Sequence, residues 1–301
     1  MTLRAPEDDD FDAMLELMNA HQLAAFGEAD LTEDELRTWL TSPSVEIDRD
    51  IRVLEQDGRL VGYVDVDSNG ADPPLWWCDV KLAPDVDEDS IAAELVGWLE
   101  RRLDAGRVRV WTSATDTRVV SALERLGFAP ARHSYRMEIG LAEEPAEPVW
   151  PDGIAVRTLA DGEERTIYDA FMEVWQDTSD PPHDTFEDWS HWMTRAETFE
   201  PSLWFLAFAG DELAGFAVCR QDTNDPAAGH VELLGVRRSW RKQGLGHALL
   251  LHSFRAFRRR GWTRGTLGVD ASSPTGATRL YERAGMTIYR DTLFLERPAR
   301  R

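Results

Sequence analysis

The order of predicted helices and strands occurs twice in this chain of 301 residues, once on each side of an acidic, proline-rich segment. That segment, residues 143–152, holds three prolines and three glutamates among its ten residues. Segments of this composition stay extended and rarely form the interior of a helix or strand. A repeat of about 150 residues is too long for one unit of a solenoid. The sequence therefore predicts a tandem duplication, with domains at residues 1–142 and 153–301 and a linker at residues 143–152.

Each copy is predicted to run through a short strand, two helices, a hairpin, a further strand, and then helix, strand, helix and strand. In the first copy, an Asp-Gly turn joins residues 51–55 to residues 60–67 as a hairpin. Residues 132–139 are expected to close the first sheet and residues 287–295 the second. Strands linked by both hairpins and helical crossovers predict an α/β fold, with a mixed, mostly antiparallel sheet flanked by helices in each copy.

The charge balance restricts the partners of the chain. It has 33 basic and 55 acidic side chains, which give a formal net charge of −22. General nucleic-acid binders and binders of anionic membranes need an excess of Lys and Arg, so the composition argues against both classes. The start of the chain lacks the pattern of a signal peptide, and no apolar stretch approaches ~18 residues. We therefore expect a soluble, cytoplasmic protein that is a monomer or a homodimer.

The two cysteines, Cys78 and Cys219, both lie in apolar runs of strand-like composition. Two thiols in a chain of this length fit neither a disulfide framework nor a metal site. They are predicted to be buried packing residues, and no metal is expected.

The segment at residues 231–246 carries the strongest chemical signal. It predicts a strand, a tight basic turn and the start of a helix. Gly244 and Gly246 remove side chains where the chain enters the helix, so backbone N–H groups there can bind an anion, and the helix dipole adds about half a positive charge. Four basic residues add to this effect: Arg237, Arg238, Arg241 and Lys242. The pattern predicts a pyrophosphate site, but it lacks the G-x-G-x-x-G spacing of dinucleotide-binding proteins.

This segment resembles the signature of a known family. The sequence R-K-Q-G-L-G at residues 241–246 is similar to the acetyl-CoA signature (R/Q)-x-x-G-x-(G/A) of the GNAT N-acetyltransferase superfamily. Residues 270–286 resemble the second signature of that family, N-x-x-A-x-x-L-Y-x-x-x-G-F, with Ser273 in place of Asn and Met286 in place of Phe. The match covers the second copy, whereas the first copy matches in element order only. The resemblance implies two tandem GNAT-like domains.

The resemblance also implies an activity, in which an acetyl group moves from acetyl-CoA to a primary amine of a small molecule by direct attack in a ternary complex. Tyr281 stands at the family position of the general acid that protonates the departing thiolate. Glu232 is the expected base, acting through water, and His230, two residues away on the same strand face, is the second candidate. Catalysis by ordered water alone stays the alternative. The residues expected to contact acetyl-CoA are Leu234, Val236, Arg241, Lys242, Gln243, Gly244, Gly246, His247 and Ser273.

The first copy provides an internal control for this site. If Leu82 corresponds to Val236, then Asp87, Ser90 and Ala92 replace Arg241, Gly244 and Gly246. Four acidic residues stand where the second copy has four basic ones: Asp85, Asp87, Glu88 and Asp89. At ~4 Å and an effective dielectric constant near 20, one pair of unit charges is worth about 4 kcal/mol, so these carboxylates would repel a pyrophosphate. The first copy is therefore predicted to keep the fold without binding the cosubstrate.

The amine acceptor is expected to bind to the loop at residues 175–192. This loop combines acidic side chains with aromatic ones, a combination that suits a cationic amine through charge and cation–π contacts. Asp184, Glu187 and Trp189 are the predicted acceptor ligands. The alternative is an acidic surface loop whose tryptophans pack in the core.

Three other functions remain open on the sequence. A non-catalytic sensor or assembly module would bind acyl-CoA at the same turn without transferring the acyl group. A different transferase would use a longer acyl-CoA. A nucleotide-binding protein would use the turn for the phosphates of ATP or NAD, which would then compete with CoA.

Overall fold

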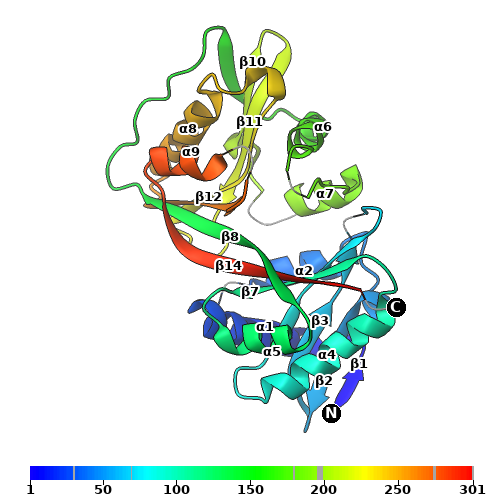
Figure 1. Cartoon of the computed structure of the whole chain (residues 1–301). Coiled ribbons are helices and arrows are strands. Elements are labelled where there is room, and N and C mark those ends of the chain that lie inside the picture. The colour runs from blue at the N-terminus through cyan, green and yellow to red at the C-terminus, as the bar shows by residue number, and fades with distance from the viewer. Residues whose placement is uncertain (30, 69, 179, 195–198, 274–275, 300–301) are drawn as a thin grey trace. The chain divides into compact units, whose positions relative to one another are not determined.

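The computed structural model describes residues 1–299, with the exception of residues 30, 69, 179, 195–198 and 274–275. Contacts divide the chain into two compact units, and Figure 1 labels many of their elements. Unit 1 comprises Met1–Ser134 together with Asp291–Arg301, and unit 2 comprises Tyr135–Arg290. No helix within the described ranges combines the length and the apolar character needed to cross a lipid bilayer.

Unit 1 contains two runs of hydrogen-bonded strands and five α-helices within its described residues. The first run has the order β1-β2-β3-β6, formed by Thr2–Arg4, Ile51–Gln56, Arg59–Asp65 and Val80–Leu82. The second has the order β4-β5-β7-β14, formed by Asp67–Ser68, Leu75–Cys78, Arg107–Ser113 and Thr287–Pro298. The helices are α1 (Phe11–Phe26), α2 (Glu33–Leu40), α3 (Ile47–Asp50), α4 (Glu88–Arg102) and α5 (Thr117–Arg125).

Local sequence explains two features of unit 1. The β2–β3 hairpin forms as predicted, because Asp57 and Gly58 adopt the positive φ angles of 54° and 78° that a tight turn of this kind needs. Helix α4 packs on β3 at Gly62, where the absence of a side chain lets Ile91 and Leu95 approach the strand. The helix that follows β6 therefore covers one face of this sheet.

Unit 2 is built around one run of strands in the order β8-β13-β12-β11-β10-β9. These strands are Ala129–Gly140, Arg264–Asp270, Ala228–Val236, Glu212–Gln221, Trp204–Ala209 and Ile154–Thr158. The helices are α6 (Glu164–Trp175), α7 (Phe186–Thr194), α8 (Leu245–Arg259) and α9 (Ala277–Arg283). β12 and β13 are parallel, whereas β9, β10, β11 and β12 pair antiparallel in succession. The predicted α/β fold, with mixed sheets flanked by helices, is confirmed.

Helix α8 covers one face of the unit 2 sheet in the way that α4 covers its sheet in unit 1. It packs on β11 at Gly215, where Leu245 and Leu249 approach the strand. Buried side chains of α6 and α7 form a second core that includes Phe171, Trp189 and residues of β10 and β11. The sheet of unit 2 is therefore enclosed by helices on both faces.

The last strand of each half of the sequence lies in the unit that the other half mainly forms. Strand β8 enters unit 2 at Tyr135 and lies beside β13, while β14 enters unit 1 at Asp291 and pairs antiparallel with β7. They are the long green and red strands in Figure 1. Leu293 and Leu295 of β14 are buried in the core of unit 1, and Met137 of β8 is buried in the core of unit 2.

This exchange makes the compact units differ from the domains predicted at residues 1–142 and 153–301. Residues 132–139 and 287–295 are strands as expected, but each contributes to the sheet of the other half. The acidic segment at residues 143–152 lies within unit 2 and does not mark its boundary. Alternation of apolar residues identifies a strand, but it contains no information on which sheet the strand joins.

Candidate active site

Strand β12 separates from its neighbour β13 midway along its length. The two strands pair from the start of β12 to Val231, and no pairing between them continues further among the described residues. β12 stays paired with β11 as far as Val236. The amide of Arg237 donates to a β11 carbonyl, so by alternation the amides of Val236 and Leu234 point to the side that β13 has left. These two amides, which the sequence predicts to contact the cosubstrate, are donors on an open strand edge.

The turn from β12 into α8 presents a row of backbone donors. Lys242 and Gly244 adopt positive φ angles of 61° and 90°, and a Cβ atom at Gly244 would meet no other atom within 4 Å. Glycine is therefore favoured here by backbone conformation and not by packing. Within the described part of the chain, the amides of residues 242–247 donate to no acceptor. A row of free amides at the N-terminus of a long helix is an arrangement that binds phosphate groups.

The basic side chains of this turn are mostly engaged by carboxylates. Arg237 pairs with Glu173 at 2.7 Å, and both Arg238 and Arg241 pair with Asp177 at 2.5 Å. The Nε group of Arg241 also donates to a β12 carbonyl oxygen at 3.0 Å. The two arginines lower the pKa of Asp177. The three arginines of the predicted cationic cluster therefore stabilise the turn, and the carboxylates of Glu173 and Asp177 neutralise much of their charge.

Lys242 and Gln243 lie at the exposed tip of the turn. Lys242 forms no ion pair with any described residue, so its charge can attract an anion. The side-chain amide of Gln243 donates to the carbonyl of Ser239 at 3.1 Å and closes the turn. Burial and the nearby Arg283 lower the pKa of His247, in the first turn of α8. The positive potential at this tip thus comes from Lys242 and the backbone.

Helix α9 lies next to the turn and carries Tyr281. A Cβ atom at Gly246 would lie 3.5 Å from Leu280 of α9 and 3.5 Å from Val236, so three elements meet at this glycine. Tyr281 is 8% exposed, and burial raises its pKa to about 12. Its hydroxyl forms no hydrogen bond with any residue that the structure describes. Ser273, in the segment before α9, donates its amide to the last carbonyl of β13 at 3.0 Å.

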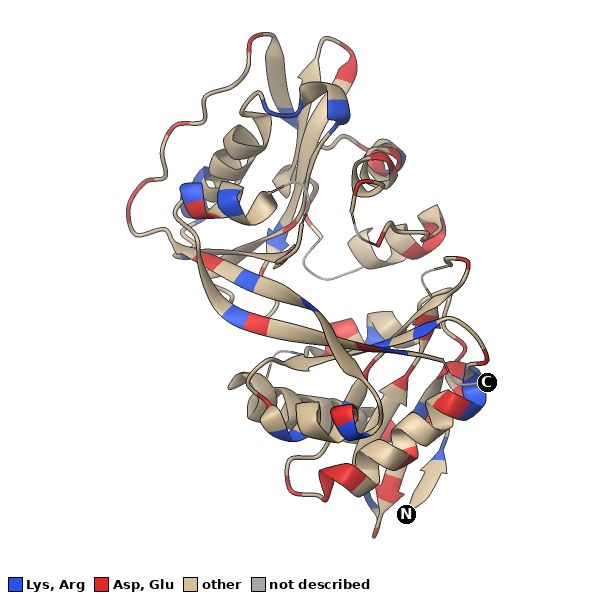
Figure 2. Ribbon diagram, viewed as in Figure 1, with Lys and Arg blue, Asp and Glu red and all other residues tan. Residues whose placement is uncertain are grey.

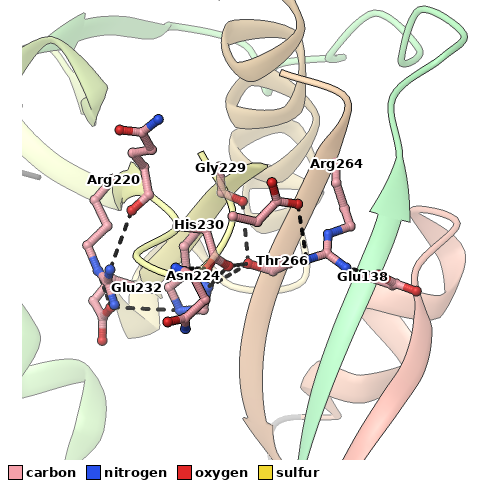
Figure 3. A network of polar contacts seen from close by, with 11 residues as sticks. Glu138, Arg220, Asn224, Gly229, His230, Glu232, Arg264 and Thr266 are labelled. Atoms are coloured by element: carbon pink, nitrogen blue, oxygen red, sulfur yellow. Dashed lines mark hydrogen bonds and ion pairs between the residues drawn. The ribbon is translucent and has the colours of Figure 1, made fainter. Parts of the chain in front are cut away.

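His230 lies at the centre of a buried polar network (Figure 3). Its Nδ1 atom is 2.8 Å from the Thr266 hydroxyl, and that hydroxyl donates to the Asp222 carboxylate at 2.7 Å. On the other side of the ring, Nε2 is 3.7 Å from a carboxylate oxygen of Glu232. Burial lowers the pKa of His230 to about 4, so its imidazole is neutral near pH 7. The fold thus brings the two predicted base candidates together.

Glu232 is an ionised carboxylate in this network. Arg220 of β11 donates its Nε proton to Glu232 at 2.9 Å (Figure 3). Burial alone would raise the pKa of Glu232, but the neighbouring His230, Arg220 and Arg136 outweigh burial and lower it. Glu232 can therefore accept a proton or a hydrogen bond near neutral pH.

The three predicted acceptor ligands have different surroundings. Trp189 is 4% exposed and packs in the aromatic core of unit 2, with ring centroids 5.7 Å from Tyr168 and 6.0 Å from Trp204. The prediction of Trp189 as an acceptor ligand is therefore corrected, because its ring already has core partners. Asp184 and Glu187 are exposed, and their carboxylates form no hydrogen bond or ion pair with other described side chains.

Sequence reasoning missed three residues of this region. Asp222 and Thr266 are 44 residues apart, and only the fold brings them together beside His230. Asp177 belongs to the predicted acceptor loop, but it is the shared partner of Arg238 and Arg241. The available signal was the complementary charge of an acidic loop and a basic turn within one domain.

Comparison with known proteins relates this site to a family. A model described as the acetyltransferase (GNAT) family matches residues 165–286. The mycothiol acetyltransferase of Nocardia farcinica is 30% identical over 246 residues, which make up 77% of this chain and 78% of that protein. Mycothiol acetyltransferases from other species align over 59% to 90% of their own length.

Solved structures agree with this relationship. A GCN5-related N-acetyltransferase from Sphaerobacter thermophilus matches with a TM-score of 0.78 and 30% identity, over 100% of this chain and 96% of that chain. A tandem GNAT protein from the clavulanic acid biosynthesis pathway has the same fold, with a TM-score of 0.74 at 17% identity over 99% of both chains. The chain therefore belongs to the GNAT family of acetyltransferases and has the two-domain architecture of its tandem members.

Proposed function

We propose that this protein transfers an acetyl group from acetyl-CoA to a primary amine of a small molecule, and that unit 2 performs the reaction. The observation that supports this most is the row of amides at residues 242–247, which have no acceptor among the described residues and adjoin the open edge of β12. The relatives named mycothiol acetyltransferase make a mycothiol-related amine the first acceptor to test.

The turn and the open strand edge divide the binding of acetyl-CoA between them. The pyrophosphate would accept hydrogen bonds from the amides of residues 242–247, and Lys242, which forms no ion pair with a described residue, would add a positive charge. The acetyl carbonyl would accept from the amide of Leu234 or Val236, which polarises it for attack. The side chains of Gln243, His247 and Ser273 would complete the proposed contacts.

The chemistry requires one bond to form and one to break. The amine nitrogen attacks the acetyl carbon, the C–N bond forms, and the C–S bond then breaks to release CoA as a thiolate. Glu232, through water, or His230 takes the proton that the nitrogen loses. Tyr281 would donate a hydrogen bond to the departing sulfur. With a tyrosine pKa of about 12 against ~8.5 for a thiol, complete proton transfer is uphill by about 5 kcal/mol, so hydrogen bonding comes first.

The state of the cysteines supports direct transfer. Both Cys78 and Cys219 are buried. Burial raises the pKa of Cys219 to about 12 and also raises that of Cys78. A reactive acyl-accepting cysteine needs an exposed thiol with a low pKa, and neither residue has these properties.

Calorimetric titration with acetyl-CoA tests the site, with two matched glycine variants. Gly244 and Gly210 both have positive φ, 90° and 59°, and a Cβ atom at either position would meet no atom within 4 Å. Alanine is therefore strained at both positions by about 1–2 kcal/mol. Gly244→Ala should weaken acetyl-CoA binding about tenfold, whereas Gly210→Ala should leave it unchanged. Equal effects of the two variants, or no binding to the wild-type protein, would contradict the proposed site.

Thiol release over a panel of amines and acyl-CoA chain lengths tests the reaction. The proposal predicts release of CoA that depends on the amine, with acetyl-CoA as the preferred donor. In Tyr281→Phe, turnover should fall about tenfold while affinity for CoA stays the same. Binding of acetyl-CoA without release by any amine would favour the sensor, and a preference for longer chains would favour a different acyltransferase.

A further inference from the structure

We infer that Asp222 and Thr266 are positioning residues, which fix the tautomer of His230 so that its Nε2 lone pair and the Glu232 carboxylate together bind the ammonium group of the acceptor. This inference rests on the proposed function, because it identifies the groups that receive the amine.

The tautomer follows from counting protons along the network. Asp222 is ionised, because hydrogen bonds from Thr266 and Asn224, together with the neighbouring His230 and Arg136, outweigh burial and lower its pKa. An ionised carboxylate only accepts, so the single hydroxyl proton of Thr266 is directed to Asp222 at 2.7 Å. The oxygen of Thr266 then accepts from His230 Nδ1 at 2.8 Å. Nδ1 therefore carries the proton of the neutral ring, and Nε2 carries the lone pair.

The Nε2 lone pair and the Glu232 carboxylate form a site for one N–H-rich cation. The two acceptor atoms are 3.7 Å apart, which is too long for a hydrogen bond, and neither carries a proton. One nitrogen atom can lie within ~3 Å of both. An ammonium group has three N–H donors and no acceptor, so it can donate to both atoms at once.

The surrounding charges keep the lone pair available. The charged groups that influence His230 are Glu232, Arg136, Arg220 and Asp222, from β8, β11, β12 and the segment after β11. Two guanidinium groups balance two carboxylates. His230 is 6% exposed, Asp222 is 6% exposed and Thr266 is fully buried, so the ring cannot turn without breaking the network. The imidazole of His230 is therefore a neutral base that the network holds in one orientation.

The proton transfers balance in two steps. The bound ammonium gives one proton to His230 Nε2 and becomes the neutral amine that attacks the acetyl carbon; the ring pKa of about 4 makes this transfer uphill, so the neutral amine is a minor, reactive species. The imidazolium is stabilised through Thr266 by Asp222, whose carboxylate is 3.9 Å from Nδ1. After the C–N bond forms, the nitrogen gives its second proton to Glu232, and the C–S bond breaks.

Nitrogen-15 NMR of histidine-labelled protein tests the tautomer directly, with His230→Gln to assign the signals. At pH 7, His230 should show a protonated Nδ1 and an unprotonated Nε2. Thr266→Val removes the acceptor of Nδ1 and should give a mixture of tautomers, whereas Thr266→Ser should keep the wild-type pattern. A purely structural role of Thr266 would leave the tautomer unchanged.

Kinetics with the same variants test the consequence. Thr266→Val should lower kcat for the amine by ten- to a hundredfold and leave the Kd for acetyl-CoA within twofold of wild type, and Thr266→Ser should restore kcat. Asp222→Asn removes the charge that stabilises the imidazolium, so the acid limb of the pH–rate profile should move to lower pH as kcat falls.

The outcomes separate this inference from the proposed function. A protonated Nε2 in the wild-type protein would overturn the inference whether or not acetyl transfer occurs, and so would a change of tautomer in Thr266→Val without a change in kcat. Failure of every amine to release thiol would overturn the proposed function and, with it, the catalytic part of the inference, even if the NMR tautomer agrees.

Discussion

The turn between β12 and α8 in unit 2 and the turn between β6 and α4 in unit 1 occupy equivalent places in the two sheets. Val236 pairs with Gly215, and Leu82 pairs with Gly62, each glycine being the residue on which the following helix packs. The correspondence of Leu82 with Val236 predicted from the sequence is therefore confirmed. Any difference between the two turns can then be assigned to their residues and not to their position.

Side-chain charge distinguishes the turns less than the sequence suggests. In unit 1, the carboxylate of Asp85 pairs with Arg59 at 2.7 Å and that of Glu88 with Arg118 at 2.9 Å. Figure 2 shows the acidic residues at the start of α4 in red. The basic residues of the unit 2 turn are similarly engaged by Glu173 and Asp177. Each turn therefore has partners that offset much of its charge.

The backbone distinguishes the turns more clearly. Residues 83–91 of unit 1 contain no positive φ angle, whereas the turn in unit 2 has two, at Lys242 and Gly244. In unit 1, Nδ1 of His21 also lies 3.2 Å from the amide nitrogen of Leu82, the donor that corresponds to Val236. In unit 1, the side chain of His21 thus occupies the edge of β6, whereas the equivalent edge of β12 in unit 2 is open. Backbone conformation and the His21 side chain, more than net charge, distinguish the turn that we propose to bind acetyl-CoA from its counterpart in unit 1.

An aspartate introduced at equivalent positions of the two turns should give the largest difference between the units. Gly244→Asp introduces a negative charge and a side chain among the amides of residues 242–247, and at ~4 Å this repulsion is worth about 4 kcal/mol, or on the order of a thousandfold in the Kd for acetyl-CoA. Ser90→Asp at the corresponding exposed position in unit 1 should change the Kd less than twofold. Calorimetry measures the Kd of both variants. A strong effect of Ser90→Asp would mean that acetyl-CoA binds to unit 1, which would contradict the proposed site in unit 2.

The exchanged strand provides the next largest effect. Leu295 is fully buried in the core of unit 1, so Leu295→Ala should lower the free energy of unfolding by about 3 kcal/mol. Urea denaturation measures this loss, and hydrogen exchange should show it as reduced protection of β7. Ile288→Ala, in the exposed first part of the same strand, is the control and should cost less than ~0.5 kcal/mol. Loss of protection in α8 instead of β7 would contradict the assignment of β14 to unit 1.

The buried His21 of unit 1 predicts a pH dependence of the free energy of unfolding. Burial, with the charges of Lys81 and Arg118, lowers the pKa of His21 to about 3, whereas the unfolded value is ~6.5. Above pH 6.5 the residue is neutral in both states, and below it only the unfolded state takes up the proton. The free energy of unfolding should therefore fall by about 1.4 kcal/mol per pH unit between pH 6.5 and 3 because of this group.

Urea denaturation at pH 7 and pH 5 measures this effect. His21→Asn keeps an acceptor for the Leu82 amide but does not titrate, so the loss of stability between these pH values should be about 2 kcal/mol smaller than in wild type. His183→Asn, at an exposed position, should leave the slope unchanged. An identical slope in His21→Asn and wild type would mean that His21 takes up its proton in the folded protein over the same pH range as in the unfolded chain.

The smallest effect concerns the arginines of the unit 2 turn. Because Asp177 already engages Arg238, Arg238→Gln should weaken acetyl-CoA binding by less than threefold. Lys242→Gln removes a charge that no described residue pairs, and it should weaken binding about five- to tenfold. A larger effect of Arg238→Gln than of Lys242→Gln would contradict this comparison. It would show that the charge of the paired arginines contributes more to acetyl-CoA binding than the charge of Lys242.

Local pattern predicted the elements of this protein well. The Asp-Gly hairpin, the strand before the basic turn and the helix after Gly244 all depend on residues close together in the chain, and all three form. The correspondence of the two turns could also be predicted, because it follows from counting along equivalent strands.

Relations between distant residues could not be predicted. The exchange of β8 and β14 depends on which sheet edge is completed, and the pairing of Asp177 with Arg238 and Arg241 depends on the position of the segment after α6. Thr266 and Asp222 have ordinary sequence surroundings, and their role arises only beside His230. The predicted ligand Trp189 was wrong for a related reason, since an aromatic residue near acidic ones does not reveal which way its ring turns.

The exchanged strands also affect how the chain is made. Residues 1–134 of unit 1 are translated before unit 2, but the core of unit 1 includes Leu293 and Leu295, which are translated after all of unit 2. The usual order, in which the N-terminal domain folds first during synthesis, cannot be completed here. Unit 1 can complete its sheet only after β14 has been translated. Until then, strand β7 has an unpaired edge that a chaperone or another nascent chain can reach.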